Sequence, residues 1–209
     1  RTVFVTGPSG SGKSSLVRAG LIHALRQGKI KSSERWLYAT LKPGRDPVDS
    51  LANAFSRLKS PELGNYFRQH VDQARVLHEC AESALTENKT QRLVLFIDQF
   101  EEVFTQISNE AERSVFLNLL THAATAESGR VIILFSMRSD FVSNCAAYPQ
   151  LNEILNQQFV QIGAMQPQEL VSAIAQPALR VGLRIDPDLI AQIINEMKGE
   201  PGALPLMQF

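Results

Sequence analysis

The stretch Gly7-Pro-Ser-Gly-Ser-Gly-Lys13-Ser14 is the strongest structural signal in this chain. It matches the phosphate-binding pattern G-x-x-x-x-G-K-[S/T], which has meaning only after a strand and before a helix. Both contexts are present, because an apolar, β-rich run fills residues 2–6 and apolar residues recur at helical spacing across residues 14–27. The sequence therefore predicts a strand, a glycine-rich turn and a helix that together bind phosphate.

The residue types of this motif suit phosphate chemistry. Gly10 and Gly12 can adopt backbone angles that turn successive N–H groups inward, and neither presents a side chain that would block a phosphate. Lys13 reaches the β- and γ-phosphates as a compact cation, and Ser14 offers its hydroxyl to Mg²⁺. The residues expected to contact a nucleotide in this segment are Gly7, Ser9, Gly10, Ser11, Gly12, Lys13, Ser14 and Ser15.

A second motif, Val-Leu-Phe-Ile-Asp98-Gln-Phe-Glu-Glu, is an apolar run that ends in acids. We expect the run to be a buried parallel strand next to the strand of residues 2–6, with the Asp98 carboxylate and Ser14 holding Mg²⁺. Hydrolysis needs a carboxylate that orients or deprotonates water, and Glu101 is preferred over Glu102 for this role. The simpler alternative for either glutamate is an ordinary acid in the first turn of a helix.

Another apolar run, residues 131–136, is followed closely by Arg138. The carboxyl ends of parallel strands face the ligand crevice in open α/β sheets, so this arginine is expected to clamp a γ-phosphate and to report its loss. The alternative is a surface cation that pairs with Asp140, and the other motifs favour the sensor role. The predicted catalytic residues are therefore Lys13, Asp98, Glu101 and Arg138, and the predicted metal ligands are Ser14 and Asp98.

Strands and helices alternate along residues 1–163. Further strands are predicted at 36–41, 92–97 and 159–162, further helices at 74–85 and 111–124, and a helix that begins at Pro47 with Asp46 as its cap. This alternation predicts a parallel α/β sheet with helices on both faces. After Gly163 the strands stop, and two helices open with prolines, at 167–181 and 187–198. We expect a P-loop core at residues 1–163 and part of a helical lid domain at 164–209.

Composition narrows the class of protein. Lysine plus arginine and aspartate plus glutamate each number 21, a balance that argues against a dedicated nucleic-acid-binding domain. No apolar run approaches the roughly 18–20 residues that span a bilayer, so no membrane partner is expected. Cys80 and Cys145 lack metal spacing and suit free thiols in a reducing cytoplasm. Because Arg1 stands directly before a strand, we expect the chain to be a piece of a longer protein.

The motif segments occur in a characteristic order: GPSGSGKSSLVRAGL (7–21), VLFIDQFEEVF (94–104), SMRSDF (136–141) with CAAYPQL (145–151), and GEPGALPL (199–206). Together they resemble the STAND class of P-loop ATPases, relatives of the AAA+ and NB-ARC proteins, and above all the bacterial novel STAND group, which is often joined to WD-type repeats. The resemblance implies that Lys13 and Ser14 are Walker A residues, that Asp98 is the Walker B acid, and that Arg138 is the sensor arginine. It also implies that Pro205 contacts adenine or the lid hinge.

By this resemblance, the chain is expected to be the ATP-binding module of a signalling switch that uses Mg²⁺, with ATP favoured over GTP. A glutamate often follows the Walker B aspartate in AAA+ proteins, and Gln99 in that place implies slow hydrolysis. The expected partners are the nucleotide, the protein's own C-terminal sensor domains outside this chain, and a second copy in a nucleotide-dependent homo-oligomer.

Three alternatives stay open at the level of sequence. An AAA+-like, DNA-associated ATPase would have a basic surface, which the balanced composition does not indicate. A small-molecule phosphotransferase would have a lid rich in arginine, but residues 164–209 contain only Arg180 and Arg184. A nucleotide-stabilised scaffold would bind ATP and never hydrolyse it.

Overall fold

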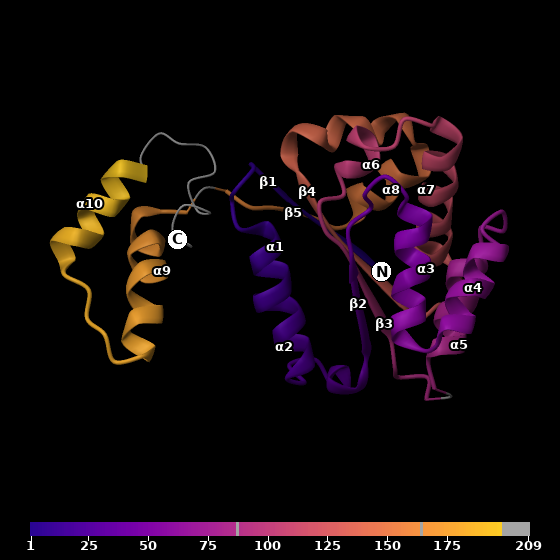
Figure 1. The fold of residues 1–209 in the computed structure, drawn as a ribbon, viewed down its shortest axis with the longest axis horizontal. Coiled ribbons are helices and arrows are strands. Elements are labelled where there is room, and N and C mark those ends of the chain that lie inside the picture. The colour runs from indigo at the N-terminus through magenta and orange to yellow at the C-terminus, as the bar shows by residue number, and fades with distance from the viewer. Residues whose placement is uncertain (87, 164, 198–209) are drawn as a thin grey trace. The chain divides into compact units, whose positions relative to one another are not determined.

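The computed structural model describes residues 1–86, 88–163 and 165–197, which divide into two units (Figure 1). The larger unit, made of Arg1–Thr6 and Lys13–Gln161, is an α/β core. The other contains Gly7–Gly12 together with the chain from Ile162 onward. The predicted domain limits, residues 1–163 and 164–209, stay a prediction.

A five-stranded parallel sheet forms the centre of the core, with strand order β2-β3-β4-β1-β5. The strands are β1 (Thr2–Gly7), β2 (Leu37–Leu41), β3 (Leu93–Ile97), β4 (Val131–Arg138) and β5 (Phe159–Gln161). Every residue of β3 is buried, as expected for a central parallel strand that is covered on both faces. The predicted fold class is therefore confirmed.

The strand order corrects one expectation. The strand that ends before Asp98, β3, does not lie next to the P-loop strand β1, because β4 lies between them. Strand β3 pairs instead with β2 and β4, so that Ile97 lies in register with Leu41 on one side and with Phe135 on the other. An apolar run predicts that a strand is buried, but it does not predict which strands lie beside it in the sheet. Arg138, rather than Asp98, thus ends the strand beside β1.

The helix that follows the glycine-rich turn is confirmed close to its predicted limits. It consists of α1 (Lys13–Ser15), a π-helical stretch (Leu16–Ile22) and α2 (His23–Arg26). Widened helical turns of this kind are frequent at functional sites. Its first residues, Lys13–Ser15, directly follow the glycine-rich turn in the sequence.

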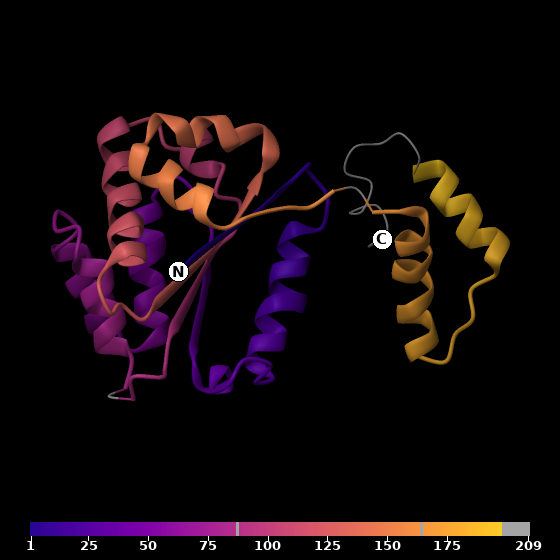
Figure 2. The same cartoon turned by 180° about the vertical axis from the view of Figure 1, so that it is seen from behind.

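Six more helices belong to the core. They are α3 (Pro47–Leu58), α4 (Pro61–Gln69), α5 (Val76–Ala84), α6 (Glu102–Thr105), α7 (Glu110–Thr125) and α8 (Pro149–Gln157), with 3₁₀ turns at Ser33–Arg35 and Ser139–Ala147. Asp46 caps α3 as predicted, because its carboxylate accepts the backbone N–H of Asp49 at 2.8 Å. Figures 1 and 2 show α1 and α2 on one face of the sheet and α3, α5 and α7 on the opposite face.

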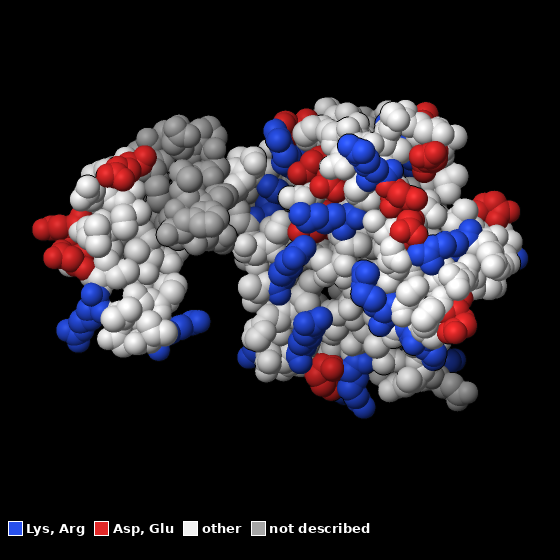
Figure 3. Space-filling view, in the orientation of Figure 1, with Lys and Arg blue, Asp and Glu red and all other residues white. Residues whose placement is uncertain are grey.

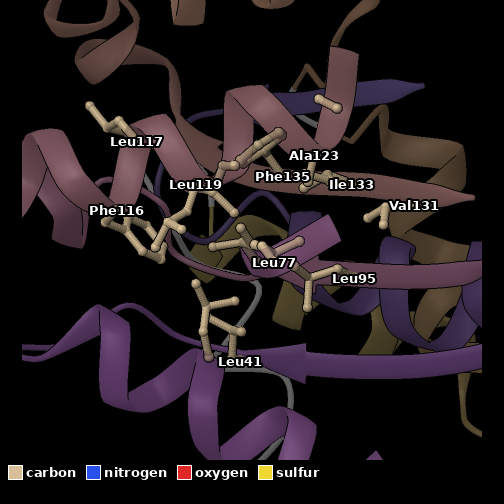
Figure 4. Close-up of a cluster of buried hydrophobic side chains, with 14 of the residues drawn as sticks. Leu41, Leu77, Leu95, Phe116, Leu117, Leu119, Ala123, Val131, Ile133 and Phe135 are labelled. Carbon is tan, nitrogen blue, oxygen red and sulfur yellow. The ribbon is translucent and has the colours of Figure 1, made fainter. Parts of the chain in front are cut away.

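A buried aromatic and aliphatic cluster fixes the strand ends. The ring of Phe4 in β1 stacks on Phe135 in β4 at 4.2 Å between centroids, and Phe100 packs edge-on against Phe135 at 4.8 Å. Figure 4 shows Phe116 and Leu119 of α7 beside side chains from the central strands. Packing at this density leaves the residues after β3 and β4 little freedom to move.

The second unit contains two helices in its described part, α9 (Pro167–Arg180) and α10 (Pro187–Met197). They confirm the two predicted helices up to residue 197. Gln166 and Glu169 form a capping box at the start of α9, with the Gln166 backbone N–H donating to Glu169 Oε2 at 2.7 Å. No helix in the described residues has the length and apolar character needed to cross a membrane.

Candidate nucleotide site

The glycine-rich turn has the backbone that its motif requires. Gly10 and Gly12 adopt positive φ angles of 69° and 82°, a conformation that side chains disfavour. A Cβ at Gly7 would lie 2.5 Å from the carbonyl oxygen of Ile162 and 2.9 Å from Ser11 Oγ, so only glycine fits there. The turn therefore depends on glycine at three of its positions. Ser9 is exposed within it.

The Asp98 carboxylate is the focus of polar contacts in the core. Its residue is 2% exposed. Oδ1 accepts hydrogen bonds from Ser14 Oγ at 2.6 Å and from Ser136 Oγ at 2.5 Å, while Oδ2 accepts one from Arg18 Nη2 at 2.7 Å. The structure thus brings together Ser14 and Asp98, the two predicted metal ligands, which are 84 positions apart in the sequence. Ser15 lies next to Ser14 and is exposed.

Ser136 connects the ends of β3 and β4. Besides its bond to Asp98, its Oγ accepts the backbone N–H of Gln99 at 3.1 Å, and its carbonyl oxygen accepts the N–H of Phe100 at 2.8 Å. Gln99 has a φ of 56°, which is uncommon for a residue with a side chain. This strained turn directly after Asp98 is held by Ser136, and strained backbone held in this way is frequent at functional sites.

The two candidate glutamates face different partners. Glu101 Oε2 accepts the backbone N–H of Arg138 at 3.2 Å, which keeps the Glu101 carboxylate at the end of β4. Glu102 Oε2 accepts the backbone N–H of Gly44 at 2.9 Å, in the loop after β2. Of the two, Glu101 is the one that acts electrostatically on Lys13. The Glu101 carboxylate is therefore held at the end of β4, and the Glu102 carboxylate at the loop after β2.

Lys13 is a buried cation, 8% exposed. Burial lowers the pKa of its ammonium group, the negative charge of Glu101 raises it in partial compensation, and Arg138 lowers it again. Burying a lysine is costly unless negative groups surround it. A lysine held in this environment is well suited to receive a polyanion, because a bound phosphate would restore the balance of charge.

Arg138 is paired within its own segment. Its Nε and Nη2 donate to the Asp140 carboxylate at 3.0 and 2.6 Å, and its guanidinium lies 5.5 Å from the centroid of the Phe141 ring. The hydrogen bonds from Arg138 lower the pKa of Asp140, and those same bonds raise the pKa of Arg138. The side chain of Arg138 is 43% exposed. This pairing is the alternative that the sequence left open, and the sensor role stays a prediction.

Pro205 and the segment of residues 199–206 lie outside the described residues. Sequence analysis assigned no role to Arg18 or Ser136, although both follow simple rules. Arg18 stands four positions after Ser14, hence on the same side of the helix, and Ser136 stands two positions before Arg138, hence on the same face of β4. Polar residues at those spacings from a predicted ligand are the signal that would have found them.

The donor set fits a magnesium ion that arrives with its nucleotide. In the described part of the chain no three His, Cys, Asp or Glu side chains gather to form a metal site of their own. Ser14 and Asp98 supply one hydroxyl and one carboxylate, both hard oxygen donors, 2.6 Å apart. Mg²⁺ is typically held by one or two such groups while water and substrate phosphates fill the remaining positions.

The fold is similar to those of a solved Walker-type ATPase and of ORC proteins. A Walker-type ATPase of Pyrococcus abyssi superimposes with a TM-score of 0.59 at 14% identity, over 97% of this chain and 60% of that one. The ORC2 protein of Aeropyrum pernix, in its ADP form, gives 0.66 at 16% identity, over 99% and 54%. Drosophila ORC bound to DNA gives 0.62 at 11% identity, over 99% and 47%.

This chain therefore spans about half of the length of those similar structures. No curated protein shows a significant sequence match to it. The sequence profile of a P-loop family, described as novel STAND NTPase 1, matches residues 1–209. Motifs, sheet order and profile agree, and we conclude that the chain is an NTPase module that belongs to the novel STAND NTPase 1 family.

Proposed function

We propose that this chain is the nucleotide-binding module of an ATP-dependent signalling switch, and that it binds ATP with Mg²⁺ and hydrolyses it slowly. One observation carries the proposal above the others. The hydroxyl of Ser14 and the buried carboxylate of Asp98 meet at 2.6 Å, beside a buried Lys13 that follows a glycine-dependent turn. This is the donor set that Mg²⁺-ATP requires.

In this proposal each residue of the site has a separate task. The amides of the turn and Lys13 bind the β- and γ-phosphates, and Ser14 and Asp98 hold Mg²⁺, which would neutralise phosphate charge. Glu101 orients the attacking water, since its carboxylate is fixed by the Arg138 amide at the end of β4. GTP is the less favoured nucleotide. Pro205 is proposed to contact adenine or the lid hinge.

Slow hydrolysis follows from the position after Asp98. An amide such as that of Gln99 can orient water and cannot take its proton. Glu101, the acid proposed for this role, has one oxygen engaged by a backbone amide at 3.2 Å. Turnover limited in this way suits a switch, whose state must persist, better than a motor.

Arg138 links the nucleotide state to the rest of the protein in this proposal. A γ-phosphate carries more charge than Asp140 and would compete for the same guanidinium, whereas ADP lacks the competing group. ATP and ADP would therefore favour different pairings of Arg138 and different states of the module. We propose that sensor domains outside this chain, and a nucleotide-dependent homo-oligomer, respond to that difference.

Substitution of the phosphate-binding lysine tests the proposal. Lys13→Ala should weaken ATP binding by about ten- to a hundredfold, because a charge-assisted hydrogen bond contributes about 1.5–3 kcal/mol. Titration with a fluorescent ATP analogue at saturating Mg²⁺ measures the change. Lys29→Ala, which removes an exposed lysine after the same helix, is the matched control. Equal affinities for wild type and Lys13→Ala would overturn the phosphate role.

A DNA-associated ATPase is the second candidate, because charge is unevenly distributed. Residues 1–60 contain eleven Lys or Arg and only three Asp or Glu. Figure 3 shows Lys and Arg side chains spread over the face that carries α1 and α2. A basic face can bind phosphate backbones even when the whole chain is neutral. ATPase activity that duplex DNA stimulates at low salt and not at high salt would favour this candidate over the switch.

A further inference from the structure

Arg18 forms an ion pair with the predicted metal ligand Asp98. The two atoms Arg18 Nη2 and Asp98 Oδ2 are 2.7 Å apart. The side chain of Asp98 is 3% exposed and that of Arg18 is 49% exposed, so a buried carboxylate is neutralised by a cation that reaches in from the surface. The guanidinium also lies 5.9 Å from the centroid of the Phe96 ring, which supports its position.

The contacts divide the two carboxylate oxygens between different kinds of donor. Among the described residues, Oδ1 accepts hydrogen bonds from two hydroxyl groups, those of Ser14 and Ser136. Oδ2 accepts the guanidinium of Arg18. A hydroxyl can keep its hydrogen bond to Asp98 while its oxygen contacts a metal, but a guanidinium has no lone pair and repels a cation. The oxygen that a metal or its water shell would use is therefore the one that Arg18 holds.

We propose that Arg18 is the resident counter-cation of Asp98 and that it competes with Mg²⁺ for this carboxylate when nucleotide binds. The inference rests on the proposed function, since it concerns the metal of that same site. Arg18 is a positioning residue, because it acts through Asp98. It stabilises Asp98 when no metal is present, and its exposed side chain can turn into solvent when a divalent cation replaces it.

Competition makes the direction of the effect definite. A residue that only held Asp98 in place would help metal binding, so its removal would weaken the affinity for Mg²⁺. A competing cation does the opposite, and its removal should tighten that affinity. Two like charges at one carboxylate repel even where water screens them, so the expected change is about fivefold or more.

The first experiment follows ATP binding as a function of Mg²⁺ concentration. Wild type, Arg18→Gln and Arg26→Gln are titrated with MgCl₂ at fixed fluorescent ATP analogue and constant ionic strength. Arg26 is the matched control, because it lies two turns further along the same helix and rests on the Tyr38 ring at 5.1 Å. Arg18→Gln should lower the Mg²⁺ midpoint about fivefold or more, and Arg26→Gln should leave it unchanged.

The outcomes separate the inference from the proposed function. If wild type binds no ATP at any Mg²⁺ concentration, the proposed function fails and the competition fails with it. If wild type responds to Mg²⁺ but Arg18→Gln has an equal or higher midpoint, the competition alone is overturned. Arg18→Lys, which keeps the charge, should have a midpoint closer to wild type than to Arg18→Gln.

A second experiment needs no nucleotide and detects the counter-cation directly. In EDTA, the Arg18→Gln variant should melt at a lower temperature than the wild-type protein, because the substitution leaves a buried carboxylate without its cation. In the Asp98→Asn background the same substitution should have little effect. If Arg18→Gln does not fold alone, recovery of folding in the double variant gives the same answer. Equal losses in both backgrounds would show that Arg18 does not act on the Asp98 charge.

Discussion

Three side chains, from the helix after the glycine-rich turn and from β4, meet at the Asp98 carboxylate. Ser14 and Arg18 come from the helix after the turn, and Ser136 comes from β4. Each contact spans 38 to 84 positions of sequence. Because a buried carboxylate needs hydrogen-bond partners, this contact set couples the helix after the glycine-rich turn to two strand ends. A change at Asp98 is therefore expected to reach Gln99 and β4 through Ser136.

Arg138 provides a prediction at the scale of one residue. Arg138→Ala should leave ADP affinity near its wild-type value and weaken ATP affinity, because only ATP offers the γ-phosphate. Asp140→Asn should raise the affinity for ATP, since it removes the carboxylate that pairs with the Arg138 guanidinium at 2.6 Å. Titrations of wild type, Arg138→Ala and Asp140→Asn with ATP and with ADP measure the ratio of the two affinities in each protein. Losses of equal size for ATP and ADP would remove the sensor role.

At the scale of elements, α4 shows where sequence reasoning ends. No helix is predicted from the sequence at residues 61–69, yet Pro61–Gln69 forms α4, which packs against α3. Glycine is needed for this contact. A Cβ at position 64 would lie 1.9 Å from Ser56 Oγ and 2.6 Å from the carbonyl oxygen of Ala52. Tertiary packing thus outweighed the low helix propensity of glycine.

This close contact predicts that Gly64→Ala destabilises the protein. Forcing a methyl group into a packed helix interface costs about 1–3 kcal/mol. Alanine gains about 1 kcal/mol over glycine in helix propensity, so the net effect is expected to be destabilising. Denaturant unfolding measures the change. Gly20→Ala is the control, because its Cβ would meet only Leu16 Cδ1, at 3.6 Å. A Gly64→Ala variant as stable as wild type would contradict the packing account.

Other elements were readable from local pattern alone. The helix at Pro47 was predicted because a proline at the first position and an aspartate before it are enough to start one. The central strands were readable because their apolar runs are buried on both faces. Their order was not, since β4 separates β1 from β3 and no local pattern encodes neighbours. Ser14 and Asp98 were predicted by motif, whereas Arg18 and Ser136 became visible only through their contacts.

At the scale of the whole molecule, this chain is an NTPase module of the novel STAND NTPase 1 family. The chain spans about half of the length of the similar solved structures, and the switch and the homo-oligomer stay proposals. The proposed site leads to one central prediction, that the metal and the nucleotide bind together. A donor set of one hydroxyl and one carboxylate binds Mg²⁺ weakly without phosphates, so metal and nucleotide should bind together.

Isothermal titration of the wild-type protein with ATP, in Mg²⁺ and in EDTA, tests this prediction most directly, with Asp98→Asn as the matched variant. We expect one ATP per chain, tighter binding in Mg²⁺ than in EDTA, and loss of that difference in Asp98→Asn. Absence of ATP binding in Mg²⁺, or an affinity that does not depend on Mg²⁺ in the wild type, would contradict it.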